Sequence, residues 1–375
     1  MTPPDFKSPS ARAVEVLRLL RNYHNVLISG PPATGKSRLL AEIRYWFAGT
    51  GSPAFTPTGP NAFPAGQQVA GATDWLPSPT RTDRKSWSIT FHQGTKYRDF
   101  IGGLMPSTDK GAGGFVVTHG PLYHAAVHGV TKDGASLVII DEINRGPAVA
   151  AFGDSITAIE RDKRLGADGK PTGMTYRFNV LNSDGKWSEL ALPHHLYLLA
   201  AMNEADTSIE PLDVAFRRRW EPYRLPVDEP VLRTYFSLPG ARTDLPAAPQ
   251  NSRDVYEALV QAWRTINERI ELGRGAEFQL GHGVLMEVPV PDLPKDTAGA
   301  LALAAQAWAR LFAHIAEVFF GDSRGVANVL GARADGTGYK LVETYFGDSL
   351  VTRLEGPDSA SPSEIYAILT AAARR

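Results

Sequence analysis

One octapeptide near the start of the sequence has the residue types and spacing of a phosphate-binding loop. The segment GPPATGKS comprises Gly30, Pro31, Pro32, Ala33, Thr34, Gly35, Lys36 and Ser37. It matches the pattern G-x-x-x-x-G-K-[ST], in which the glycines let backbone N–H groups turn toward phosphate oxygens. The lysine then reaches the β- and γ-phosphates, and the following hydroxyl ligates Mg²⁺. The sequence therefore predicts a nucleoside triphosphate site, with Ser37 as a Mg²⁺ ligand.

Two acidic residues end an apolar run in the segment LVIIDE, at Asp141 and Glu142. A continuous apolar run of this kind is typical of a central parallel strand that is buried on both faces. An aspartate at the tip of such a strand predicts Mg²⁺ coordination, and the glutamate after it predicts polarisation of an attacking water. The alternative is a strand that simply ends in acids at the surface.

A third polar side chain, Asn203, follows the apolar segment LYLLAAM. An amide at this place can orient the attacking water or contact the γ-phosphate. The alternative is an asparagine that only forms a turn.

Three consecutive arginines, Arg217, Arg218 and Arg219, precede Trp220 on an expected helix that covers EPLDVAFRRRW. A triphosphate site needs positive charge on the γ-phosphate in the transition state, and an arginine supplied by a neighbouring copy would provide it. Two other interpretations stay open: a solvated basic helix end, which the helix dipole favours, and a patch that binds DNA phosphates. We expect Trp220 to pack into the core and fix the end of the helix.

Composition excludes several classes of protein. The formal net charge of the 375 residues is −1, which gives no overall attraction to nucleic acid or anionic lipid. The sequence has no cysteine, which excludes disulfides and thiolate chemistry and fits a reducing compartment. No signal peptide is recognisable, and the longest apolar stretch contains Arg310, His314 and Glu317. We expect a cytoplasmic protein without membrane contact.

Strands and helices that alternate along the chain must position these side chains. Short apolar runs predict strands over 25–30, 86–92, 134–142 and 195–203, and a helix follows the phosphate loop as far as Gly49. We also expect a helix over 150–163 and a β-hairpin around the NSDG turn at 182–185.

This order predicts an α/β fold with a parallel sheet, followed by a smaller helical lid. We assign residues 1–226 to the nucleotide-binding core, with a long Gly/Pro-rich insertion over 49–86. Residues 227–321 form the expected helical lid, with long helices over 252–272 and 299–320. Residues 322–375 form an extension with a hairpin and a final helix, whose role stays open.

Several sequence blocks resemble the McrB-type branch of the AAA+ NTPases, a dynein-related group. The blocks are TFHQGTKYRDFIGGLMP (90–106), GPLYHAA (120–126), DEINR (141–145), IERDKR (159–164), AMNEADTS (201–208), LDVAFRRRW (212–220) and FQLGHGVLM (278–286). They follow the order of the family over roughly residues 25 to 290. The family's usual MNTAD motif departs here at Glu204, which replaces the threonine and leaves Asn203 and Asp206 in place.

The resemblance implies roles for the site residues. It assigns Walker A to Gly30–Ser37, Walker B to Asp141 and Glu142, and sensor 1 to Asn203. Arg218 and Arg219 match the positions that act on the nucleotide of a neighbouring subunit, which implies a ring, most often a hexamer. The lid residue that senses nucleotide stays open between Arg253 and His282.

The same resemblance implies an NTPase that couples hydrolysis to DNA translocation or to activation of an McrC-like nuclease subunit in a restriction or phage-defence system. We expect ATP as the substrate, with GTP as the alternative. McrB-type proteins usually carry an N-terminal DNA-reading domain, which we do not expect ahead of residue 25. DNA contact would then come from a partner or from pore loops, with 161–164 and 182–185 as candidates. A different class, the MoxR-like protein-remodelling chaperones, is the alternative function.

Overall fold

The computed structural model describes residues 8–48, 74–107, 114–205, 212–240, 244–332, 338–357 and 360–374. Their contacts divide the chain into two compact units. The first unit comprises residues 1–29 and 36–224, and the second comprises residues 30–35 and 225–375. The phosphate-loop segment 30–35 thus groups by its contacts with the C-terminal part of the chain, although its neighbours in sequence belong to the first unit.

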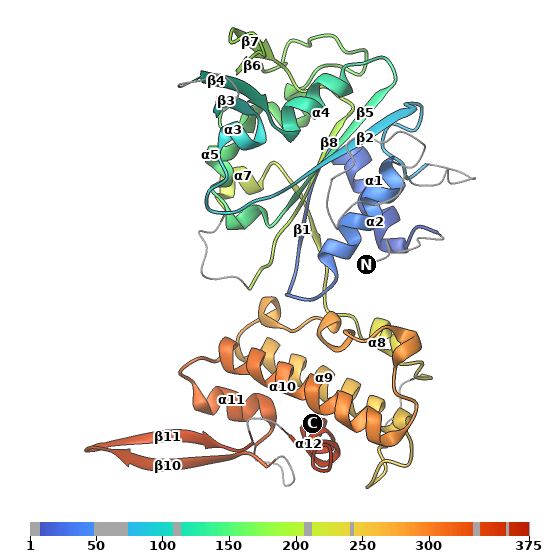
Figure 1. The fold of residues 1–375 in the computed structure, drawn as a ribbon, viewed down its shortest axis with the longest axis vertical. Helices are drawn as coiled ribbons and strands as arrows, with labels where there is room; N and C mark the ends of the chain where they lie inside the picture. Colours follow the sequence, from blue (N-terminus) through green and yellow to red (C-terminus); the bar gives the residue numbers. More distant parts are fainter. Residues whose placement is uncertain are drawn as a thin grey trace. The chain divides into compact units, whose positions relative to one another are not determined.

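A five-stranded parallel sheet forms the centre of the first unit (Figure 1). Its strands, in spatial order, are β2 (Asp83–Thr90), β5 (Gly134–Asp141), β8 (Leu196–Ala201), β1 (Asn25–Ser29) and β9 (Glu221–Arg224). All neighbouring pairs are parallel. The strands β5 and β8 are buried along almost their whole length, as expected of apolar runs that are covered on both faces.

Helices cover both faces of this sheet. Figure 1 shows α1 (Ala11–Tyr23) and α2 (Lys36–Ala48) on one side, and α3 (Tyr97–Phe100), α4 (Pro121–Gly129) and α5 (Ala148–Phe152) on the other. The Ser10 hydroxyl caps α1 by accepting a hydrogen bond from the amide of Ala13 at 3.2 Å. The three-layer arrangement confirms the predicted α/β class with a parallel sheet.

Two antiparallel hairpins extend the first unit. One joins β6 (Phe178–Leu181) to β7 (Trp187–Leu190) and confirms the hairpin that we predicted around residues 182–185. The other joins β3 (Gly102–Ser107) to β4 (Gly114–His119) and has no counterpart in the prediction. The ring of His119 on the second hairpin hydrogen-bonds to the carbonyl of Leu181 on the first at 2.8 Å, so the two hairpins pack together.

The helix expected over 150–163 is divided into shorter pieces. The structure has α5, then α6 (Ser155–Ala158) and a 3₁₀ turn at Arg161–Lys163. Gly153 separates the first two with a φ of 49°, which a continuous helix does not contain. A Cβ at Gly153 would also lie 2.7 Å from the ring of Tyr97, so the break is tied to packing.

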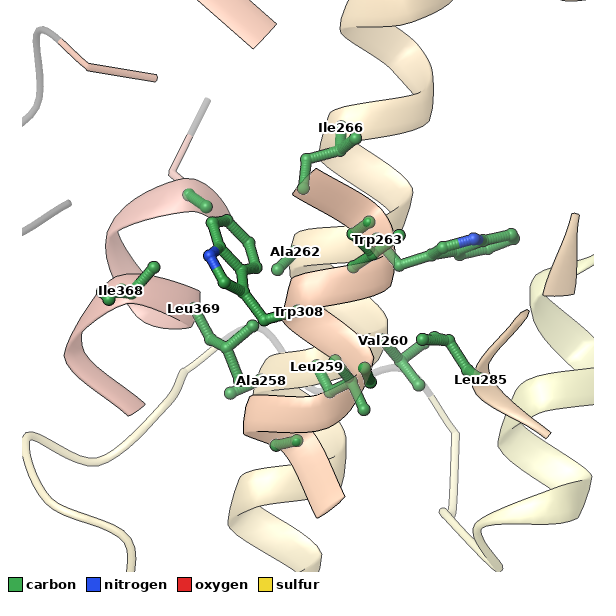
Figure 2. Close-up of a cluster of buried hydrophobic side chains, with 14 of the residues drawn as sticks. Ala258, Leu259, Val260, Ala262, Trp263, Ile266, Leu285, Trp308, Ile368 and Leu369 are labelled. Atoms are coloured by element: carbon green, nitrogen blue, oxygen red, sulfur yellow. The ribbon is translucent and has the colours of Figure 1, made fainter. Parts of the chain in front are cut away.

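Helices dominate the second unit. They are α8 (Glu229–Tyr235), α9 (Ser252–Gly273), α10 (Thr297–Val318), α11 (Ser323–Leu330) and α12 (Ile365–Ala372). Figure 2 shows Trp308 of α10 against Ile368 and Leu369 of α12, beside Ala262 of α9. Trp308 is fully buried, so one apolar core joins the three helices.

A long hairpin of β10 (Lys340–Phe346) and β11 (Ser349–Glu355) projects from the helices of the second unit (Figure 1). The hairpin and α12 confirm the elements predicted after residue 322. Large apolar side chains near its tip are exposed, among them Tyr345 and Phe346. Within the part of the chain that the structure describes, every helix is too short or too polar to cross a membrane.

Candidate functional site

The central strands of the first unit bring the predicted site residues to one edge of the sheet. Strand β8 lies between β5 and β1, and all three run in the same direction. Asp141 ends β5, Asn203 lies two residues beyond β8, and the phosphate loop begins directly after β1. In open parallel sheets, ligands bind beyond the carboxyl ends of the strands, which is where these side chains lie.

Asp141 and Ser37 provide oxygen atoms that suit Mg²⁺. The Ser37 hydroxyl donates to Oδ2 of Asp141 at 3.4 Å, and Oδ1 of Asp141 accepts a hydrogen bond from the amide of Glu142 at 3.0 Å. Carboxylate and hydroxyl oxygens are the hard ligands that Mg²⁺ prefers. The side chain of Ser37 is exposed, so a metal ion with its waters has access to it.

Glu142 has a left-handed backbone, with φ of 52° and ψ of 44°. This conformation costs a non-glycine residue roughly 1–2 kcal/mol, and such strain concentrates at functional sites. Asn203 donates from Nδ2 to Oε1 of Glu142 at 3.0 Å, and Arg145 forms an ion pair with Oε2 at 3.2 Å. The carboxylate is therefore held on both oxygens by residues from two neighbouring strand ends.

Lys36 is buried close to three carboxylates. Burial lowers the pKa of its ammonium group from 10.5 to about 8, while Glu142, Glu204 and Asp141 oppose this shift. Burial therefore disfavours the charged lysine here, and a bound triphosphate would favour it. This environment fits a lysine that binds phosphate.

The loop 30–35 has the backbone geometry of a phosphate cradle. Gly30 and Gly35 have φ values of 154° and 89°, and a Cβ at Gly30 would lie 2.3 Å from the carbonyl oxygen of Leu225. Ala33 has a φ of 58°, and the buried Thr34 hydroxyl donates to the carbonyl of Pro31 at 3.0 Å. The residues present therefore fit a nucleotide with Mg²⁺, as the motif predicts.

Sequence reasoning gave no role to Glu204, Asn144 or Arg145, which support the site. Glu204 accepts a hydrogen bond from the Ser29 hydroxyl at 2.6 Å and pairs with Arg224 at 3.2 Å. Asn144 donates to the carbonyl of Asn203 at 3.1 Å. The block DEINR contains Asn144 and Arg145, so its last two residues were the available signal.

The three arginines differ in their surroundings. The predicted helix is short: α7 covers Val214–Arg217, and Arg218 caps its end. Arg219 pairs with Glu160 at 2.8 Å and donates to the carbonyl of Ala215 at 2.6 Å. The Arg218 side chain is exposed, and its guanidinium has no hydrogen-bond or ion-pair partner among the residues that the structure describes.

A surface pocket of about 400 Å³ adjoins these arginines. Arg161, Arg218 and Arg219 line it together with Glu160. Trp220 also reaches this pocket, but its side chain is only 5% exposed and lies edge-on to Phe152 at 6.2 Å between ring centroids. The prediction that Trp220 packs into the core is confirmed.

The structure does not support one of the two predicted pore loops, the segment 161–164. Arg164 of the segment 161–164 is fully buried, where it donates to Oδ1 of Asn25 at 2.6 Å and to the carbonyl of Ile159. Arg164 therefore cannot contact a ligand in a pore, and Arg161 is tied to the carbonyl of Asn22 at 3.0 Å. In the hairpin tip at 182–185, residues 183–185 are exposed.

The two lid residues that we considered as nucleotide sensors, Arg253 and His282, have different surroundings. Arg253 is exposed at the start of α9. His282 is 6% exposed, and its Nε2 lies 3.9 Å from the place of a Cβ on Gly35. Of the two, only His282 is shown near the phosphate loop. Asp206 lies outside the described residues.

Comparisons with known proteins agree with this geometry. Residues 66–220 match the model of the AAA domain, dynein-related subfamily, a range that includes Asp141, Glu142, Asn203 and the three arginines. The chain has an α/β P-loop fold, and its residues 66–220 are similar to AAA domains. The predicted resemblance to McrB-type AAA+ proteins is confirmed by two curated relatives from restriction systems.

The first relative is the type IV methyl-directed restriction enzyme EcoKMcrB subunit of Escherichia coli (strain K12), which is 24% identical over 286 residues. The second is the type II restriction enzyme BsuMI component YdiS of Bacillus subtilis (strain 168), which is 30% identical over 215 residues. The matches cover 74% and 54% of this chain, and the chain spans 50% and 60% of the lengths of these relatives. A solved structure, C. elegans PCH-2, is 12% identical with a TM-score of 0.34 and covers 80% of this chain and 68% of that chain.

Proposed function

We propose that this AAA+ protein is an ATPase that assembles into a hexameric ring. Its hydrolysis of ATP would activate a partner nuclease of a restriction or phage-defence system. The observation that carries the proposal is the set of Lys36, Ser37, Asp141, Glu142 and Asn203, which lie together at one edge of the parallel sheet. Each has the residue type that triphosphate hydrolysis requires at that place. The two restriction-system relatives supply the biological context.

In this proposal, each side chain has one task. Lys36 binds the β- and γ-phosphates, and Ser37 and Asp141 hold Mg²⁺, which neutralises charge on the phosphates. Glu142 accepts the proton of the attacking water, and Asn203 orients that water. Because both oxygens of Glu142 are engaged here, catalysis requires that the carboxylate turn from Asn203 or Arg145 toward the water.

Arg218 is the residue that we propose to act on the nucleotide of a neighbouring subunit. Its exposed guanidinium is available for a partner, whereas Arg219 is engaged within its own chain by Glu160 and Ala215. Arg219 would then hold the backbone from which Arg218 projects. An arginine that arrives from another subunit makes hydrolysis depend on assembly, so we expect the monomer to hydrolyse slowly.

We propose an McrC-like nuclease subunit as the partner and DNA as its substrate. The turn at 182–185, next to the exposed Lys186 and Trp187, is the candidate for DNA contact in the ring. Lys186 is 81% exposed and Trp187 is 71% exposed, and a cation beside an aromatic ring suits a nucleic-acid strand.

The first test is an affinity purification of tagged Glu142→Gln protein with ATP and Mg²⁺, followed by mass spectrometry. The substitution removes the base and should retain nucleotide, so the assembled ring accumulates. Lys36→Ala protein is the control, because it should not bind nucleotide or assemble. Co-purification of a nuclease-bearing subunit with Glu142→Gln protein alone is the expected result.

Other outcomes of this experiment have defined meanings. A co-purified adhesion-domain client without a nuclease would replace the restriction proposal with a remodelling chaperone of the MoxR-like kind. Competition of ATP with GTP for the purified protein decides the nucleotide. If the purified protein hydrolyses neither ATP nor GTP, the proposal that it is an NTPase is wrong.

A further inference from the structure

The loop 30–35 is bound by a segment some 250 residues away in the sequence, Gln279–Gly283. The amide of Gly281 donates to the carbonyl of Pro32 at 2.9 Å. The amide of Gly283 donates to the carbonyl of Ala33 at 2.8 Å. Two successive carbonyls of the phosphate loop are therefore fixed by the same short segment of the second unit.

Gly281 and Gly283 must both be glycine, because a side chain at either position would collide with the phosphate loop. A Cβ at Gly281 would lie 2.2 Å from the carbonyl carbon and oxygen of Ala33, and a Cβ at Gly283 would lie 2.8 Å from the same oxygen. Gly281 has a φ of −62°, which every residue adopts, so its backbone does not call for glycine. Glycine is needed at position 281 because the backbone there approaches the phosphate loop closely.

Side chains of α9 hold the segment Gln279–Gly283 in place by hydrogen bonds to Leu280. Asn267 donates to the carbonyl of Leu280 at 3.0 Å and accepts from its amide at 2.7 Å, and Trp263 donates to the same carbonyl at 2.8 Å. These groups are buried, and Figure 2 shows Trp263 and the neighbouring Leu285 on the same side of α9. A displacement of Gly281 or Gly283 would therefore have to disturb the core of the second unit.

His282 lies between the two glycines and faces the last residue of the loop. Its side chain is 6% exposed, and Nε2 is 3.9 Å from the place of a Cβ on Gly35. Gly35 directly precedes Lys36, the residue that we propose to bind phosphate. The position of His282 thus bears on the backbone that carries Lys36.

We propose that Gly281, His282 and Gly283 are positioning residues for nucleotide binding, which hold the carbonyls of Pro32 and Ala33 outward so that the loop amides stay turned toward phosphate. The inference rests on the proposed function, because it assumes that the loop binds a nucleoside triphosphate. It adds that the affinity for nucleotide depends on the order of α9, and that a bound nucleotide orders α9 in return.

The test compares Gly281→Ala, His282→Ala and His282→Gln with Gly240→Ala in the full chain. Gly240 is the matched control, because it lies in the same unit and a Cβ there meets no described residue within 4 Å. Binding of a non-hydrolysable ATP analogue with Mg²⁺ is measured by calorimetry. Hydrogen exchange of 255–283 is followed with and without the analogue.

We expect Gly281→Ala and His282→Ala to bind at least about tenfold more weakly, the loss of one good hydrogen bond or more. His282→Gln should recover part of this affinity, and Gly240→Ala should match the wild type. In the wild type the analogue should slow exchange over 255–283, and in His282→Ala this slowing should be lost while exchange without nucleotide stays unchanged.

Wild-type affinity and wild-type protection in His282→Ala would overturn the inference, even if Gly281→Ala fails to fold. Weak binding without any change in nucleotide-induced protection would also overturn it, because a coupling to α9 is then absent. A wild-type protein that binds no analogue would instead show that the proposed function fails, and the inference with it.

Discussion

Asn203 donates a hydrogen bond from Nδ2 to Oε1 of Glu142, with 3.0 Å between the two atoms. The two residues follow neighbouring parallel strands, β8 and β5, so the sheet fixes their separation. Asn144, two residues after Glu142, donates a hydrogen bond to the backbone carbonyl of Asn203 at 3.1 Å. The pair is thus part of a hydrogen-bond network that joins the two strand ends. Removal of one member should therefore disturb the positions of the others.

Replacement of Asn203 by alanine should lower the turnover of ATP by about 10²-fold, because the proposed orienting donor is lost. The affinity for nucleotide should stay within about threefold, since Lys36 and the loop are intact. Steady-state hydrolysis and calorimetric binding measure the two quantities. Asn328→Ala, an exposed asparagine on α11, is the control. Unchanged turnover in Asn203→Ala would remove this residue from the mechanism.

Arg218→Ala should bind nucleotide normally and hydrolyse it about 10³-fold more slowly, as expected for an arginine that acts on the transition state. Arg217→Ala, which removes the adjacent exposed arginine, should keep wild-type turnover. Mixing Arg218→Ala with Glu142→Gln subunits should restore part of the activity, because a mixed interface joins an intact nucleotide site to an intact Arg218. If the mixture is as inactive as its components, Arg218 does not act between subunits.

Arg219 should behave differently from Arg218, because its guanidinium binds Glu160 and Ala215 of its own chain. Arg219→Ala should slow hydrolysis and also lower thermal stability, since a partly buried ion pair is broken. Glu160→Gln should reproduce a smaller part of both effects. A loss of turnover in Arg219→Ala with unchanged stability and a normal Glu160→Gln would instead assign Arg219 to the neighbouring nucleotide.

Removal of Mg²⁺ by EDTA should abolish hydrolysis, and Asp141→Asn should raise the Mg²⁺ concentration for half-maximal rate by about tenfold or more. Asp141 is the expected metal ligand with Ser37, whose hydroxyl lies 3.4 Å from Oδ2. Asp184→Asn, at the exposed tip of the β6–β7 hairpin, is the control for loss of one acidic charge. A Mg²⁺ dependence that is equal in Asp141→Asn and the wild type would exclude Asp141 as a ligand.

The residues at the strand ends could be predicted because their signal is local. A buried parallel strand is a continuous apolar run, so Asp141 and Asn203 are recognised by what precedes them. The hairpin β3–β4 gave no such signal, because Gly102, Gly103 and Pro106 interrupt any alternation. The break at Gly153 was missed as well, since the contact with Tyr97 that requires it comes from a distant part of the sequence.

The contacts of loop 30–35 were beyond any sequence pattern. The pattern G-x-x-x-x-G-K-[ST] describes how the loop meets phosphate, and says nothing about the outward-facing carbonyls of Pro32 and Ala33. Their partners, Gly281 and Gly283, are identified only by the hydrogen bonds of the folded chain. The difference between Arg218 and Arg219 likewise depends on Glu160, which comes near only when α7 packs within the first unit.

His24 gives a prediction about stability in acid. Its ring is 1% exposed and lies against Tyr197, with 5.2 Å between the centroids and 17° between the planes. Burial lowers its pKa from 6.5 to about 2, and the positive charge of Arg164 adds to this shift. The folded protein therefore keeps His24 neutral at pH 5, whereas the unfolded chain takes up a proton there.

Because the unfolded state binds the extra proton, the contribution of His24 to the free energy of unfolding is retained above pH 6.5 and is lost as the pH falls below it. The slope approaches about 1.4 kcal/mol per pH unit for one proton. His24→Phe keeps an aromatic ring beside Tyr197 and removes the titration. Urea unfolding at pH 7.5 and pH 5 should therefore show a loss of stability that is smaller in His24→Phe than in the wild type by about 2 kcal/mol. Equal losses in the two proteins would mean that His24 is protonated in the folded state.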